Sequence, residues 1–145
     1  MPDEVMAMNL SKLATAIVAT AMLSGPLAAA NEACAPMNHV VRTARTDFPA
    51  LRSLKMAPGI CTFRSSEFKC RWAFPGDAFG TAEGQFQGMM QCAAAATAEA
   101  PRKLKRGQTL VALEPDLSLV VAEPAIDSGQ WVIVMRIIAG TPPAG

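Results

Sequence analysis

The sequence predicts a single α+β domain in which two helices pack on an antiparallel sheet of about five strands. Three observations predict this fold: two segments with apolar residues at helical spacing, several shorter strand-like segments, and an even number of cysteines, four in all. The chain of 145 residues is long enough for one domain. We expect that domain over residues 31–139, after a signal peptide at 1–30 and before a disordered tail at 140–145.

The first thirty residues have the order of a secretory signal peptide. Lys12 precedes an uncharged apolar run at 13–23, a helix-breaking Ser-Gly-Pro follows, and small residues at 28–30 end the segment. The run is shorter than the roughly 20 apolar residues of a membrane span. The sequence therefore predicts cleavage near Ala30 and a periplasmic or secreted bacterial protein, with a buried N-terminal helix as the alternative.

The position of the true start is open. Asp3 and Glu4 are unusual in the basic region that precedes a signal core. Met6 and Met8 therefore remain alternatives to Met1 as the first residue of the signal peptide.

Two segments have helical periodicity. Residues 36–55 place apolar side chains along one helical face, and Pro49 predicts a kink or a restart there, with Asp47 as a cap. A second helix is expected over about residues 78–98, capped by Asp77. Because glycine costs about 1 kcal/mol relative to alanine in a helix, its glycines predict close approach to the sheet or the other helix. These are Gly80, Gly84 and Gly88.

Five shorter segments predict strands. The first two flank a polar turn and read as a hairpin, and the last three are separated by turn residues. The segments are 60–63, 67–73, 109–113, 117–122 and 131–138. The last of them is apolar on both faces apart from Arg136, which predicts a central or doubly covered strand.

The cysteines predict two disulfides. An even number of cysteines in a small exported domain is typical of a disulfide framework. A four-thiolate zinc site is the alternative, but the gaps of 27, 9 and 22 positions lack the close pairs of structural zinc sites. The cysteines are Cys34, Cys61, Cys70 and Cys92.

Their pairing is only partly constrained by the hairpin. If Phe63 faces Phe68, Cys61 faces Cys70, because both pairs belong to one register. We therefore favour one bridge within the hairpin and a second between the other two cysteines. Bridges from each hairpin cysteine to a covering helix remain open.

The composition argues against several classes of function. A net charge of +1 gives no general attraction to nucleic acid. The chain has one histidine, His39, and no tyrosine, which leaves few general acid–base groups or metal ligands. Nucleotide-binding glycine fingerprints and the Gly-x-Ser-x-Gly element of hydrolases are both missing from the sequence. We therefore expect no cofactor and no metal.

The chain has one concentrated charge run, within residues 101–107. Four basic residues in five positions are suited to an anionic partner, such as a lipid headgroup, an acidic glycan or an acidic protein. They are Arg102, Lys103, Lys105 and Arg106. A solvated connector, balanced by the acidic residues that follow it, is the alternative interpretation.

Two further functions are conceivable on specific residues. A carboxylate-only enzyme would use acids that fall in turns beside strands. Those acids are Glu114, Asp116, Glu123 and Asp127. A metal or small-ligand carrier would combine Met37 and His39 with a nearby thioether such as Met89.

The sequence as a whole favours a non-enzymatic function. We expect a small binding or inhibitor-like module that acts on an envelope or extracellular protein. Such a function is expected on loops and sheet edges, at 101–108 and 123–130.

Overall fold

The computed structural model describes residues 32–141. The chain divides into two units, residues 1–35 and 36–145. Of the first unit, residues 32–35 are described, and they are helical. The predicted signal peptide, its cleavage site near Ala30 and the end of the predicted tail lie outside the described residues.

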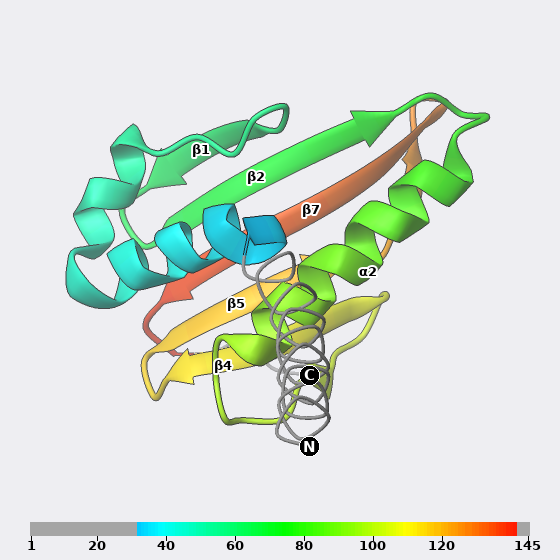
Figure 1. The fold of residues 1–145 in the computed structure, drawn as a ribbon. Helices are drawn as coiled ribbons and strands as arrows, with labels where there is room; N and C mark the ends of the chain where they lie inside the picture. Colours follow the sequence, from blue (N-terminus) through cyan, green and yellow to red (C-terminus); the bar gives the residue numbers. More distant parts are fainter. Residues whose placement is uncertain (1–31, 142–145) are drawn as a thin grey trace, which may run out of the picture. The chain divides into compact units, whose positions relative to one another are not determined.

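The second unit is built on a seven-stranded antiparallel sheet (Figure 1). Six strands follow one another in the order β1-β2-β7-β5-β4-β3, and β6 pairs with β7 beside this path. The strands are β1 (Ile60–Arg64), β2 (Glu67–Phe74), β3 (Arg102–Lys103), β4 (Gln108–Glu114), β5 (Leu117–Ala122), β6 (Ala125–Asp127) and β7 (Gln130–Ala139). The last strand, β7, lies between β2 and β5, so its central position confirms the prediction from its apolar run.

Short turns set the registers of the hairpins. Only Ser65 and Ser66 separate β1 from β2, and Phe63 pairs with Phe68 as the alternation predicts. Between β6 and β7, Ser128 and Gly129 both have positive φ, at 52° and 79°. Two such residues form the kind of two-residue turn whose twist matches a β-hairpin.

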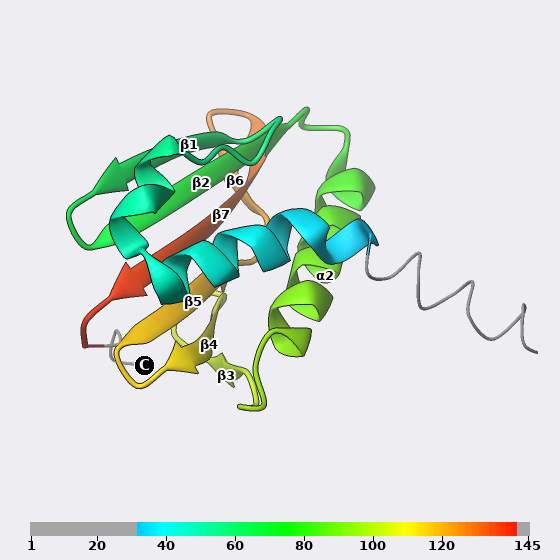
Figure 2. The same ribbon diagram turned by 60° about the vertical axis from the view of Figure 1, so that its left-hand side comes forward.

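Three helices are present within residues 32–141. The first covers residues 32–46, a 3-10 helix η1 (Phe48–Ser53) follows, and α2 (Phe79–Ala95) connects β2 to the second half of the sheet. From residue 36 onward the first helix lies with α2 on the same face of the sheet (Figure 2). η1 packs on β1, and α2 packs on β7, β5 and β2.

The core lies between these helices and the sheet. Alternate residues of the central strands point into it and are buried, because each strand has a side-chain period of two. The main sheet contributions are Phe68, Cys70, Trp72, Val111, Leu119, Val121, Ile133, Met135 and Ile137. The helices contribute Met37, Val40, Val41, Ala44, Ala82, Phe86, Met89 and Ala93.

The structure corrects the predicted number of elements. The sheet has seven strands rather than about five, because β3 and β6 span only two and three residues and carry no readable alternation. The first predicted helix is two elements. The α-helix ends before Asp47, and Pro49 stands in the first turn of η1, where its missing N–H is tolerated.

Two expectations for α2 are wrong. Its N-cap residue is Ala78 without a side-chain hydrogen bond, so Asp77 does not cap it. The three helix glycines approach neither the sheet nor the first helix, because a Cβ added at any of them would meet no atom within 4 Å. They lie on the solvent side of α2.

Both predicted disulfides form. Cys61 lies opposite Cys70, as the register predicts, and the two are bonded to each other, which is the favoured one of the pairings that the sequence left open. Cys34 and Cys92 are disulfide-bonded as well, and no described cysteine is free. Disulfides of this kind persist in oxidising compartments.

Candidate binding face

The face of the sheet opposite the helices has no helix over it among the described residues (Figure 2). Side chains from β1, β2, β7, β5 and β4 share this open face, because residues paired across neighbouring strands point to the same side. One complete row crosses six strands at a single level. In order it is Thr62, Lys69, Arg136, Val120, Leu110 and Arg102.

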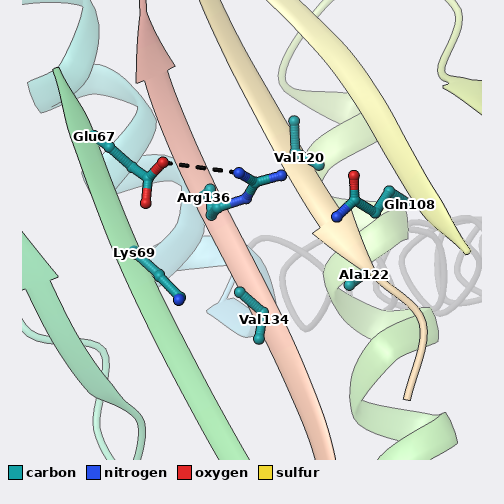
Figure 3. A pocket seen from close by; sticks show the side chains of 7 residues that line it. All are labelled: Glu67, Lys69, Gln108, Val120, Ala122, Val134 and Arg136. Atoms are coloured by element: carbon teal, nitrogen blue, oxygen red, sulfur yellow. Dashed lines mark ion pairs between the residues drawn. The ribbon is translucent and has the colours of Figure 1, made fainter. Parts of the chain in front are cut away.

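A shallow hollow of about 280 Å³ lies in the middle of the open face (Figure 3). Its polar lining comes from β2, β7 and the start of β4, and its apolar lining from β5 and β7. The lining residues are Glu67, Lys69, Gln108, Val120, Ala122, Val134 and Arg136. Val120 is only 1% exposed and forms the floor.

Two cations lie side by side on neighbouring strands at one side of this hollow. Lys69 and Arg136 are direct cross-strand partners, an arrangement that is unfavourable for like charges. Glu67 lies 3.8 Å from Arg136, between Oε2 and Nη1, whereas Lys69 forms no ion pair among the described residues. Figure 3 shows the Lys69 ammonium turned toward Val134, away from the Arg136 guanidinium. The hollow therefore carries one more positive than negative charge.

The hydrogen-bonding capacity of the hollow is suited to an anion. The Gln108 amide faces the Arg136 guanidinium across the hollow (Figure 3). Amide N–H, guanidinium and ammonium groups all donate hydrogen bonds, and charge-assisted bonds to a carboxylate are the stronger kind. The polar side chains that face the open hollow thus offer donors in excess of acceptors.

The predicted basic run lies at one edge of the same sheet. Arg102 and Lys103 form β3, while Lys105 and Arg106 lie in the turn that leads to β4. All four are exposed. Because Arg102 pairs with Leu110, and Leu110 pairs with Val120, Arg102 belongs to the open face, at the end of the central row. The run is therefore continuous with the hollow.

The acids expected in turns do not meet in one cleft. Glu114 is the last residue of β4 and Asp116 lies in the turn before β5, whereas Glu123 and Asp127 follow the other end of β5. The six residues of β5 separate the two groups by about 20 Å. Two of the acids form ion pairs: Glu114 with Arg45 at 3.2 Å and Asp127 with Arg71 at 3.0 Å.

The residues of the carrier hypothesis also lie apart. Met37 and Met89 are buried in the core, whereas His39 is exposed on the other side of the first helix. Within residues 32–141, no group of three or more His, Cys, Asp or Glu side chains is placed to hold a metal ion.

The hollow itself is not predicted by the sequence. Lys69 and Glu67 read as ordinary outward-facing residues of an alternating strand, and Gln108 as part of a connector. The one signal was Arg136, the single charged residue in an otherwise apolar central strand.

The chain matches no protein-family model, no curated protein and no solved structure. Among the described residues, no helix has the length and hydropathy needed to cross a membrane.

Proposed function

We propose that this protein is an exported binding module. Its open sheet face docks an acidic segment of an envelope or extracellular protein. The observation that carries the proposal is the pair of cations, Lys69 and Arg136, on neighbouring strands beside an apolar hollow, on a face that no helix within residues 32–141 covers.

Charge complementarity supports an acidic partner. Among the described residues, the open face has four cations on β1, β2 and β7, and two acids, Glu67 and Asp127, lie near them. The cations are Arg64, Lys69, Arg71 and Arg136. A partner that supplies carboxylates would relieve the repulsion between opposed cations, and complementary charge also accelerates encounter.

Binding is better supported than catalysis. The hollow contains one carboxylate, that of Glu67, and it is engaged with Arg136. General acid–base catalysis needs a group placed to exchange a proton, and carboxylate-only catalysis needs two such groups. Cations over an apolar floor instead match the polar and apolar groups that protein interfaces combine.

Export is part of the proposal. The order of charge, apolar run and small residues in positions 12–30 supports it, and two disulfides in a small domain are typical of the periplasm or the extracellular space.

Photo-crosslinking in the native host tests the docking face. A benzophenone amino acid would replace Thr62, at the β1 end of the central row, or, as a control, Gln91 on the exposed side of α2. We expect a crosslinked protein adduct from position 62 and none from position 91. Equal adducts from both positions, or an adduct from position 91 alone, would contradict the proposal, as would the absence of any adduct from position 62.

A further inference from the structure

The central row of the open face has a pattern of its own. Cations stand at its two sides, Lys69 and Arg136 on β2 and β7, and Arg102 on β3. The apolar part of the hollow lies between them, with Val120 as its floor and Ala122 and Val134 half-buried beside it. The order across the strands is therefore cation, apolar, cation.

We propose that this row recognises an extended protein segment with acidic side chains at positions i and i+4 and an apolar side chain at i+2. The inference deepens the proposed function and rests on it. One acid binds between Lys69 and Arg136, the apolar side chain enters the hollow, and the second acid binds Arg102.

The spacing of the strands leads to this motif. From Arg136 to Arg102 the row crosses from β7 over β5 and β4 to β3, which is three strand spacings or about 14 Å. An extended segment advances about 13 Å over four residues, and its side chains at i, i+2 and i+4 point to one side. The three side chains thus fit the three parts of the row.

The acid at position i binds at a pair of cations whose charge the fold balances only in part. Lys69 and Arg136 repel each other across the strands, and Glu67 offsets only the guanidinium. A carboxylate between them neutralises both cations, while the Gln108 amide lies on the far side of the hollow.

The acids of the open face favour a protein segment over a polyanion. Glu67 lies beside the hollow, and Asp127 holds Arg71 at 3.0 Å. A continuous polyanion such as a sulfated glycan would place negative charge over both of these carboxylates. A segment with two separated acids avoids them and also fills the apolar hollow.

Calorimetry with synthetic peptides on the purified, oxidised mature protein tests the motif. The probe is a ten-residue peptide with Glu at i and i+4 and Leu at i+2. One control peptide carries Gln in place of both Glu, and another has the same composition with the two Glu adjacent. We expect the control peptides to bind at least about tenfold more weakly, since each lacks a charge-assisted contact.

Protein variants locate the contacts. Lys69→Gln and Arg102→Gln each remove a cation of the row, and Lys105→Gln removes one from the adjoining turn. We expect each row variant to weaken binding of the probe by about tenfold and Lys105→Gln by less than about twofold. All three side chains are exposed, so a difference in folding is not expected.

Several results would overturn the motif. They are equal affinity for the adjacent-Glu peptide, an equal effect of Lys105→Gln and Arg102→Gln, and equally tight competition by a heparin oligosaccharide. Failure of every peptide to bind would also overturn it. A crosslink from position 62 in the host would still stand in that case, so the failure of this motif is distinguishable from the failure of the docking face.

Discussion

Single residues determine how closely the chain packs on the helix side of this sheet and which charges its open face carries. Arg136 is the only charge in β7 and places a guanidinium in the middle of the open face. Gly59, on the other side, lets the chain pass against the indole of Trp72. The sequence showed Arg136 as an exception within an apolar strand. It could not show the role of Gly59, because its neighbour lies thirteen positions away.

Two glycine variants are expected to change stability in opposite directions. A Cβ at Gly59 would lie 2.6 Å from two atoms of the Trp72 ring, whereas one at Gly84 would meet nothing within 4 Å. We expect Gly59→Ala to lower the free energy of unfolding by about 1–3 kcal/mol through overpacking. Gly84→Ala should raise it by about 0.5–1 kcal/mol, because alanine favours the helix. Urea unfolding of both variants measures this, and a destabilised Gly84→Ala would mean that α2 packs on something through its glycine side.

At the scale of elements, the local sequence pattern predicts the register of a hairpin, but it does not predict which distant strands pair. The hairpin register follows from a period of two, so the alternation of residues alone places Cys61 opposite Cys70. Sheet order has no such local signal, because β7 pairs with both β2 and β5, and β2 lies more than fifty residues earlier. The hollow depends on that order, since Lys69 and Val120 become near neighbours only when β7 lies between their strands.

The hairpin disulfide should contribute measurable stability. It closes a loop of nine positions, and the chain-entropy account gives about 2–3 kcal/mol for a loop of that size. We expect the double variant Cys61→Ala/Cys70→Ala to lose about this much free energy of unfolding in urea titrations. An unchanged midpoint would show that the hairpin is already ordered in the unfolded chain.

The outer edge of β4 is closed by side chains rather than by a strand. β3 pairs only with Thr109 and Leu110 of β4. Further along β4, Arg45 Nη2 donates hydrogen bonds to the carbonyls of Leu113, at 3.2 Å, and of Ala96, at 3.0 Å. Thr97 Oγ1 donates a hydrogen bond to the carbonyl of Ala112. Such closure protects an edge from pairing with another chain.

Loss of the Arg45 hydrogen bonds should lower the free energy of unfolding, whereas replacement of a neighbouring arginine should not. We expect Arg45→Met, which keeps much of the apolar stem, to lower the free energy of unfolding by about 0.5–1.5 kcal/mol. Arg42→Met, one turn earlier on the same helix, should change it by less than about 0.5 kcal/mol. Thermal unfolding of the pair gives the comparison, and equal losses would show that helix propensity, not the β4 edge, is responsible.

At the scale of the whole molecule, the described part of the second unit, residues 36–141, is a sheet with its helices on one face and a positively charged hollow on the other. Helices on a single face follow from the pattern of two amphipathic segments, which the sequence displayed. The other face stays open because the described residues contain no further amphipathic helix to cover it. Which side chains gather on that face depends on the order of the strands, so the sequence alone does not show it. Two disulfides staple this layered unit, as expected for a small exported domain.

If the protein is exported as proposed, it should carry no free thiol. We expect intact mass spectrometry of the form purified from the exported fraction to show a chain that begins at Asn31 and is four hydrogens lighter than its reduced form. Four thiols that react without prior reduction, or a chain that retains residues 1–30, would contradict the expected processing and compartment.

The most direct test of the central claim compares two charge-reversed variants in the native host. Lys69→Glu/Arg102→Glu changes both ends of the central row, and Lys55→Glu/Lys105→Glu makes the same change in net charge at exposed positions off the row. Native mass spectrometry of the exported fraction then measures the partner protein bound to each. If the open face binds an acidic partner, the partner is lost from the row variant and retained by the control. A partner that stays bound to the row variant, or leaves both variants equally, would show that this face is not the binding site.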